Sequence, residues 1–201
     1  MGFALTHCPP LMSTSLRRAA FLDRDGVINI DRAYLYRQED FEFVPGFFKA
    51  ANQLVDAGFE LVVVTNQSGI ARGYYTEADF WALTEWMTSV LKDKGIPLLD
   101  VLFCPHHPTK GQGAYQCDCM CRKPAPGMLL EAAKRHHLTL NASLMFGDKL
   151  SDIQAGINAG CRANILLGKN GDTPPLETDL TDLRFMNLLE AVQDPRVLSL
   201  F

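Results

Sequence analysis

Short apolar runs alternate with helix-like segments along most of this 201-residue chain. The clearest run, 60–64, is rich in β-branched residues and is typical of a strand that is covered on both faces. Further strand-like runs lie at 19–22, 101–103, 143–146 and 161–167, and helix-like patterns lie at 45–57, 76–93, 127–136, 151–159 and 185–192. This order predicts an α/β fold with a parallel, doubly wound sheet and right-handed crossovers.

Residues at the predicted helix ends support this division. Thr76, followed by acidic residues, resembles a helix N-cap with an acidic first turn. Ser151 and Gln154 fit a capping box for the next-to-last helix. The stretch 109–116, rich in Gly, Gln and Thr, is expected to be an insertion between the third strand and the helix after it.

Length and composition favour a single domain over 19–201, preceded by an extension over 1–18. Hydrophobic residues make up 47% of the chain and charged residues 21%, which suits a substantial core. The net charge of −4, with no basic stripe, argues against nucleic acid as a partner. No apolar run approaches the roughly 20 residues that a membrane span requires. The N-terminus lacks a secretory pattern, so we expect a cytoplasmic protein, and a monomer.

The tetrapeptide Asp23-Arg24-Asp25-Gly26 follows the first apolar run and carries the strongest chemical signal. Residues two apart in an extended chain point to the same side, so both carboxylates can face one ligand. Gly26 permits a sharp departure of the backbone. Two converging carboxylates suit a hard cation such as Mg²⁺, and one of them can attack an electrophile. For this tetrapeptide alone, a polar turn after a strand is the alternative.

Polar residues also follow the other predicted strands, and ligands of doubly wound sheets bind outside the carboxyl ends of the strands. The run 60–64 is followed by hydroxyl and amide side chains that suit phosphate oxygens, namely Thr65, Asn66, Gln67 and Ser68. The run 143–146 is followed by Gly147-Asp148-Lys149, and Arg122-Lys123-Pro124 precedes it. Each group alone is equally consistent with an ordinary turn or a solvated charge, but all are expected at one edge of one sheet.

Together these residues form a set suited to phosphoryl transfer. Asp23, Asp25 and Asp148 can hold one Mg²⁺, while Lys123 and Thr65 balance the charge of a transferring phosphoryl group. Asp23 is the candidate nucleophile, which would form an aspartyl-phosphate. Asp25 is the candidate acid that protonates the leaving oxygen, and then the base that deprotonates the hydrolytic water.

Four of the six cysteines lie between positions 104 and 121. In a cytoplasmic chain such clustering favours a metal site over a disulfide framework. Two closely spaced pairs supply one histidine and three thiolates, a normal ligand set for structural Zn²⁺: Cys104, His106, Cys119 and Cys121. Cys117 and His107 are further candidate ligands, and free thiols in a loop are the alternative to a metal. Bound Zn²⁺ would fix this polar insertion and hold Arg122 and Lys123 beside the phosphate.

Asp23-x-Asp25-Gly26, Thr65, Lys123 and Gly147-Asp148, in this order, resemble the four motifs of the haloacid dehalogenase superfamily of phosphatases. Longer stretches resemble the heptose-bisphosphate 7-phosphatases, in the histidinol-phosphatase-like group of that superfamily; these are 21–26, 64–73, 104–108, 121–124 and 147–149. The resemblance covers roughly residues 20–189. It implies a Rossmann-like domain of the haloacid dehalogenase type without a large cap, in which short loops and a zinc-bound insertion over 104–121 shape the site.

The resemblance also implies a role for individual residues. Asp25 would contribute its backbone carbonyl to the Mg²⁺ site of Asp23 and Asp148, and Arg122 would recognise the substrate. Cys119 and Cys121, directly before Arg-Lys-Pro, are selected as zinc ligands. Further positions match substrate contacts: Asp31, Arg32, Ala33, Tyr34, Ser68 and Lys149. The implied substrate is a small sugar bisphosphate, hydrolysed during synthesis of ADP-heptose or GDP-heptose precursors of lipopolysaccharide or S-layer glycans.

Two alternatives remain at this point. Histidinol-phosphate phosphatases share the fold, the zinc loop and the chemistry, although the continuation 68–73 favours the heptose-bisphosphate enzymes. A non-catalytic, zinc-stabilised binding module is the alternative from a different class. Such a module has no need of Asp25 as an acid and base, so the intact motifs speak against it.

Overall fold

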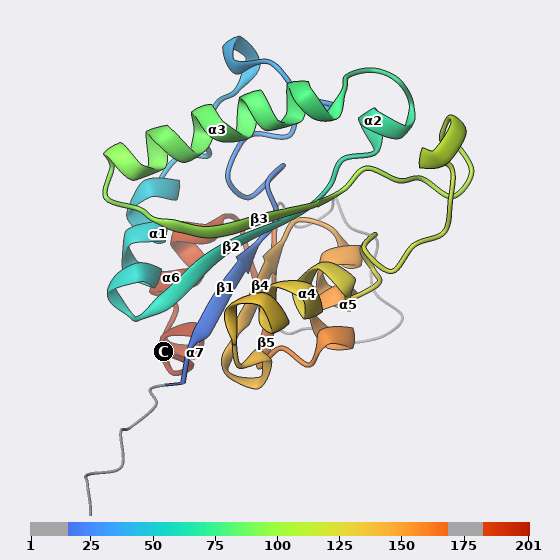
Figure 1. Cartoon of the computed structure of the whole chain (residues 1–201). Helices are drawn as coiled ribbons and strands as arrows, with labels where there is room; N and C mark the ends of the chain where they lie inside the picture. Colours follow the sequence, from blue (N-terminus) through green and yellow to red (C-terminus); the bar gives the residue numbers. More distant parts are fainter. Residues whose placement is uncertain (1–15, 169–182) are drawn as a thin grey trace, which may run out of the picture.

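A parallel sheet of six strands forms the centre of the part of the chain that the computed structural model describes, residues 16–168 and 183–201 (Figure 1). The strand order is β3-β2-β1-β4-β5-β6. The strands are β1 (Arg18–Leu22), β2 (Phe59–Asn66), β3 (Leu98–Cys104), β4 (Leu144–Gly147), β5 (Ala163–Leu167) and β6 (Arg184–Phe185). The predicted parallel α/β sheet is therefore confirmed.

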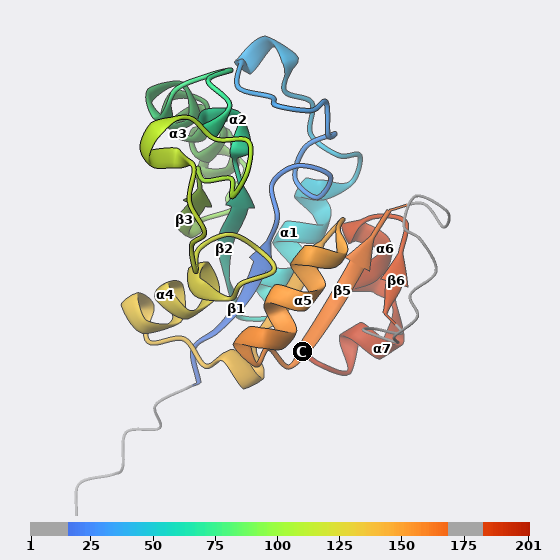
Figure 2. The ribbon, with the colours of Figure 1, turned by 90° about the vertical axis from the view of Figure 1, so that its right-hand side faces the viewer.

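Helices cover both faces of the sheet (Figures 1 and 2). On one face lie α1 (Phe47–Asp56), α3 (Glu77–Asp93), α6 (Leu188–Gln193) and α7 (Pro195–Leu198). On the other lie α4 (Gly127–His136) and α5 (Leu150–Ala159). Alternate residues of β1 supply the two cores, because Ala20 and Leu22 pack with the first group of helices while Ala19 and Phe21 pack with the second.

The short elements lie in the connections. They are η1 (Gln38–Asp40), α2 (Ser68–Ala71), η2 (Gly113–Tyr115) and η3 (Leu140–Ala142). The predicted insertion after β3 thus contains only the turn η2 within 109–116. Within the described ranges, no helix combines the length and the apolar character that crossing a membrane would demand.

The structure confirms one predicted helix start and corrects two others. Thr76 caps α3, accepting from the backbone N–H of Asp79 at 3.1 Å. The predicted Ser151–Gln154 capping box is wrong, because α5 begins at Leu150 and the carboxylate of Asp152 accepts from the backbone N–H of Lys149 at 2.9 Å. The predicted helix 185–192 begins later, at Leu188, because Phe185 belongs to the edge strand β6.

The register of the sheet brings the ends of three strands to one edge. Leu22, the last residue of β1, pairs with Val63 of β2 and Phe146 of β4. β1 begins at Arg18, one residue inside the predicted extension, and residues 1–15 lie outside the described part of the chain. The residues that follow β1, β2 and β4 therefore meet, as expected for ligand sites of doubly wound sheets.

Candidate active site

Asp23 lies directly beyond β1, where its backbone N–H donates to the carbonyl oxygen of Phe146 at 3.0 Å. The residue is buried, with 5% of its surface exposed. The chain then turns at Gly26, whose φ is +86°. A Cβ at this position would lie 2.3 Å from Oδ2 of Asp148, so the turn requires glycine on conformational and steric grounds. The backbone thereby brings aspartates from two strand ends against each other.

Lys123 is the counterion of this acidic group. Its buried ammonium lies 3.0 Å from Oδ1 of Asp23 and 2.7 Å from Oδ1 of Asp152. It also donates to the carbonyl oxygen of Val64 at 2.7 Å. Burial lowers the pKa of Lys123, but the two carboxylates outweigh burial and hold it above its ordinary value. Asp152 is absent from the predicted site residues. Its place one helical turn after Asp148 is the sequence signal that could have identified it as a site residue.

Three carboxylates converge beyond β1 and β4, because oxygens of Asp23, Asp148 and Asp152 lie within 4.8 Å of one another. Burial, together with the charges of the other two, raises the pKa of Asp148 to about 7. Its Oδ1 is buried with no hydrogen-bond partner among the described residues. Burial also raises the pKa of Asp23 in spite of Lys123, because one ammonium faces several carboxylates. The excess negative charge and the oxygen donors fit a divalent cation such as Mg²⁺.

The carboxylate of Asp25 lies outside this acidic group and accepts hydrogen bonds from three residues. Oδ1 accepts from Nη2 of Arg24 and Nδ2 of Asn29, both at 3.0 Å, and Oδ2 accepts from Nε2 of Gln67 at 3.0 Å. Arg24 is 2% exposed and donates in turn to the carbonyl oxygen of Leu35 at 2.9 Å. The structure thus brings together the side chains of two of the three predicted Mg²⁺ ligands, Asp23 and Asp148, whereas the side chain of Asp25 is not part of this group.

The residues at the end of β2 have distinct roles. Thr65 is buried, and its Oγ1 accepts from Nε2 of Gln67 at 2.9 Å. The Asn66 side chain makes two hydrogen bonds with the backbone of Lys123: its Nδ2 donates to the carbonyl oxygen at 3.0 Å, and its Oδ1 accepts from the N–H at 3.1 Å. Asn66, predicted to contact a phosphate, therefore positions Lys123 in this structure, while Ser68 begins α2.

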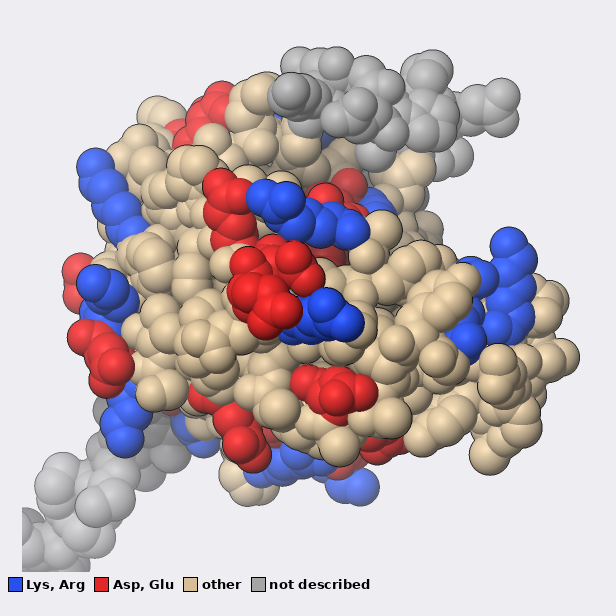
Figure 3. Space-filling model, turned by 90° about the horizontal axis from the view of Figure 1, so that it is seen from above, with Lys and Arg blue, Asp and Glu red and all other residues tan. Residues whose placement is uncertain are grey.

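A cavity of about 260 Å³ opens beside these side chains. Its lining contains most of the predicted substrate contacts and three further residues, Asp25, Gly69 and Tyr75; the predicted contacts in it are Asp31, Ala33, Tyr34, Asn66, Gln67, Ser68 and Lys149. Arg32 is not in this lining, because its guanidinium pairs with Glu42 at 2.7 Å on the surface. The view onto this side of the molecule shows acidic and basic side chains next to one another (Figure 3).

Lys149 and the loop 31–34, which faces it, define the mouth of the cavity. The ammonium of Lys149 lies 3.1 Å from Oδ2 of Asp31 and 3.7 Å from Oδ2 of Asp148. Ala33 and Tyr34 both adopt left-handed backbone conformations, with φ of +53° and +55°. The Tyr34 ring packs edge-on against Tyr74 at 4.8 Å between centroids, which fixes the loop over the site.

The predicted zinc ligands come together in the described insertion: Cys104, His106, Cys119 and Cys121. The three Sγ atoms are 3.1, 3.2 and 3.5 Å apart, and Nδ1 of His106 is 3.4 Å from Sγ of Cys121. Tetrahedral bonds of about 2.3 Å would place neighbouring sulfurs about 3.8 Å apart, so a small expansion accommodates Zn²⁺. Cys117 is not part of this group. Arg122 donates to the carbonyl oxygen of His106 at 3.1 Å, which couples the cluster to the residue before Lys123.

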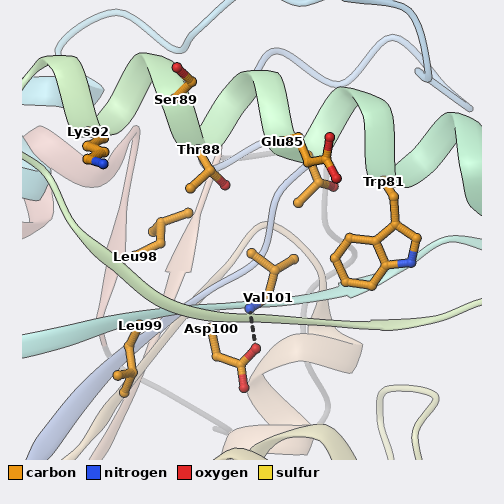
Figure 4. Close-up of a pocket in the computed structure, with 10 residues that line it drawn as sticks. Trp81, Glu85, Thr88, Ser89, Lys92, Leu98, Leu99, Asp100 and Val101 are labelled. Carbon is orange, nitrogen blue, oxygen red and sulfur yellow. Dashed lines mark hydrogen bonds between the residues drawn. The ribbon is translucent and has the colours of Figure 1, made fainter.

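A larger groove of about 570 Å³ lies between α3 and the edge strand β3 (Figure 4). Trp81 and Glu85 line it from α3, and Val101 lines it from β3. The Asp100 carboxylate at its margin accepts from the Val101 N–H at 2.8 Å and pairs with Arg135 at 2.9 Å. The groove shares no lining residue with the cavity beside Asp25, so it is not part of the candidate active site.

The fold and the residues at the strand ends define a phosphatase of the haloacid dehalogenase (HAD) class. The profile of the HAD-hydrolase-like family matches residues 120–187. The chain is 31% identical to a D,D-heptose 1,7-bisphosphate phosphatase from B. bronchiseptica whose crystal structure contains magnesium and phosphate. The two structures have a TM-score of 0.73 over 90% of this chain and 98% of the other.

Comparison with sequences of known proteins shows the family to which this chain belongs. A D-glycero-beta-D-manno-heptose-1,7-bisphosphate 7-phosphatase from Pasteurella multocida is 49% identical over 152 residues, 76% of this chain and 82% of that protein. One from Helicobacter pylori is 46% identical over 176 residues, 87% of this chain and 95% of that protein. This chain belongs to the family of D-glycero-beta-D-manno-heptose-1,7-bisphosphate 7-phosphatases, and it is a phosphoric monoester hydrolase. The family and the enzyme class predicted from the sequence are confirmed.

Proposed function

We propose that this protein is a Mg²⁺-dependent phosphatase that converts D-glycero-β-D-manno-heptose 1,7-bisphosphate and water to heptose 1-phosphate and inorganic phosphate. The observation that carries the proposal is the buried Asp23, paired with Lys123 at 3.0 Å beyond the end of β1, in a chain whose relatives are named for such a bisphosphate. We place the reaction in the cytoplasm, in the supply of nucleotide-activated heptose.

In the first step, Asp23 attacks phosphorus. The new bond forms between its carboxylate oxygen and phosphorus while the bond from phosphorus to the 7-oxygen of the sugar breaks. Asp25 gives its proton to that departing oxygen, so the sugar leaves as an alcohol. Lys123 and the Thr65 hydroxyl stabilise the charge on the phosphoryl oxygens, and Lys123 already lies within contact distance of Asp23.

In the second step, water attacks the phosphorus of the aspartyl-phosphate. Asp25, now ionised, takes a proton from the water, and the bond from phosphorus to the Asp23 oxygen breaks. Inorganic phosphate leaves, and both carboxyl groups return to their starting forms. The three residues that donate to Asp25 suit this double role, because they hold its carboxyl group in one position in both steps.

Magnesium and zinc have separate roles in this proposal. Asp23 and Asp148, with the Asp25 carbonyl, would hold Mg²⁺, which screens the repulsion between the attacking carboxylate and the phosphate. The cysteine and histidine cluster would hold Zn²⁺ as a structural ion, because its four protein ligands leave no open position for catalysis. Zinc would then order the insertion that carries Arg122.

Cations around His107 that form no ion pair among the described residues favour a bisphosphate. Arg72, Lys110 and Arg122 form no ion pair with a carboxylate in the ranges 16–168 and 183–201. Burial and the charges of these three residues lower the pKa of His107, so the cations gather around one point. The Arg72 guanidinium also lies 5.6 Å from the centroid of the cavity-lining Tyr34. A second phosphate is attracted by such a group, whereas the ammonium of histidinol phosphate is repelled.

The test is phosphate release with Mg²⁺ from both anomers of heptose 1,7-bisphosphate and from histidinol phosphate, measured side by side. We expect preference for the β-bisphosphate and a loss of at least about 10³-fold in the Asp23→Asn variant. Preference for histidinol phosphate would favour the alternative enzyme. Hydrolysis that survives Asp23→Asn would contradict the assigned nucleophile, and no release from any substrate would favour the binding module.

A further inference from the structure

Tyr75 contributes a buried hydroxyl to the candidate active site, at a position that the sequence motifs do not include. The residue is 6% exposed, and its hydroxyl donates to Oε1 of Gln67 at 2.5 Å. Burial raises the pKa of Tyr75 well above its ordinary value, so this hydroxyl keeps its proton. Oε1 of Gln67 therefore has a permanent donor.

The surroundings fix the Tyr75 ring. It stacks on Tyr36 with 5.2 Å between centroids and an interplanar angle of 13°. On its other side the ring approaches Gly69 so closely that a Cβ there would lie 2.1 Å from Cε1 of Tyr75. The hydroxyl is thus held at one place by a ring that fills its site.

The opposite end of the Gln67 amide faces the reacting groups. Nε2 donates to Oδ2 of Asp25 at 3.0 Å and to Oγ1 of Thr65 at 2.9 Å. A primary amide has one acceptor end and one donor end. With Tyr75 bound to the acceptor end, only N–H groups can face Asp25 and Thr65.

This orientation has a consequence for the protonated form of Asp25, which the proposed first step requires. If the amide were reversed, Oε1 would accept the Asp25 proton and also the Thr65 hydroxyl proton, and both would be turned away from the substrate. In the observed orientation Gln67 can accept neither. The Asp25 proton is left for the sugar oxygen, and the Thr65 proton is left for the phosphoryl group.

We propose that Tyr75 is a positioning residue that, by holding the Gln67 amide, reserves the protons of Asp25 and Thr65 for the substrate. The inference rests on the function proposed above. It predicts that Tyr75→Phe acts through Gln67, and that it lowers kcat most for substrates whose leaving group needs a proton.

The experiment measures kcat and KM for Tyr75→Phe on heptose 1,7-bisphosphate and on p-nitrophenyl phosphate, whose leaving group needs no proton. We expect kcat on the sugar substrate to fall about tenfold with KM nearly unchanged, and a smaller loss on p-nitrophenyl phosphate. Tyr36→Phe is the matched control, because its hydroxyl binds only Arg37 among the described residues, and we expect it to retain wild-type kinetics. Thermal unfolding of each variant checks that the ring packing is intact.

A double-mutant cycle separates positioning from packing. In a Gln67→Met background, Tyr75→Phe should change kcat less than about twofold, because the amide that it orients is gone. Gln67→Glu provides a second test that leaves Tyr75 in place: a carboxylate cannot donate to Asp25, so kcat on the sugar should again fall about tenfold.

Three results would overturn the inference. They are unchanged kcat in Tyr75→Phe or Gln67→Glu, equal losses on both substrates, and losses that add fully in the Gln67→Met background. These results are judged against a wild-type enzyme that hydrolyses the sugar bisphosphate. A wild-type protein that releases phosphate from neither substrate would instead overturn the proposed function, and this inference with it.

Discussion

Lys123→Met is the substitution whose cost follows most directly from the structure. The change keeps the length of the side chain but removes the ammonium that lies 3.0 Å from Asp23 and 2.7 Å from Asp152. Both carboxylates then remain buried without their counterion. Removing one partner of a buried ion pair costs about 3–5 kcal/mol of the free energy of unfolding.

This loss in the free energy of unfolding can be converted to a change in melting temperature from the length of the chain. An unfolding entropy of about 2.1 cal/mol/K per residue gives about 0.4 kcal/mol per degree for a protein of this length. Lys123→Met should therefore lower the melting temperature by about 7–12 °C in calorimetry at pH 7.5 without added Mg²⁺.

Two variants make the measurement specific. Lys149→Met removes a lysine whose side chain is 55% exposed and that also faces Asp148, so we expect a loss below about 1 kcal/mol. Adding Asp152→Asn to Lys123→Met removes one of the two stranded charges and should recover part of the lost stability, but no activity. A Lys123→Met protein that melts within about 2 °C of the wild type would refute the role of Lys123 as a buried counterion.

Three further predictions concern the zinc cluster, substrate recognition and an ion pair at the surface. Removal of zinc should speed hydrogen exchange around Cys119 and lower activity, and full activity after verified zinc loss would contradict the organising role of the metal. Arg122→Ala should lower kcat/KM for the bisphosphate at least about tenfold more than for p-nitrophenyl phosphate, whereas equal losses would argue against recognition. Burial raises the pKa of Asp100, but hydrogen bonds from His136 and the Val101 N–H, with the charge of Arg135, hold it below its usual range. Asp100→Asn should therefore lower the free energy of unfolding by about 1 kcal/mol at pH 7, measured by denaturant unfolding. The difference from the wild type should be present above about pH 4 and disappear as the pH falls further. A difference that does not depend on pH would exclude these pairs as its source.

The sequence predicts the sheet and the catalytic edge for identifiable physical reasons. Apolar runs such as 60–64 mark strands that are buried on both faces, and the order of the elements requires parallel strands whose ends meet. The sequence therefore predicts Asp23, Thr65 and Asp148 at one edge of the sheet, because each follows or ends such a run.

The remaining features depend on contacts between segments, for which sequence patterns give a weak signal or none. Asp152 reaches Lys123 because the first turn of α5 folds against Gly147, where a Cβ would lie 2.1 Å from that of Asp152. Tyr75 follows no strand and carries no motif, and its role is visible only through Gln67. The helices α2 and α7 are too short for the helical period to reveal them.

The central claim is that Asp23 forms a covalent bond to phosphorus, and the Asp25→Asn variant tests it most directly. With p-nitrophenyl phosphate the first step needs no acid, but the second step lacks its base. We predict a burst of about one nitrophenolate per active site followed by slow turnover, with a phosphoryl group on the peptide that contains Asp23 after acid quenching and mass spectrometry. Normal steady turnover with no burst, or a phosphoryl group on any other residue, would contradict the mechanism.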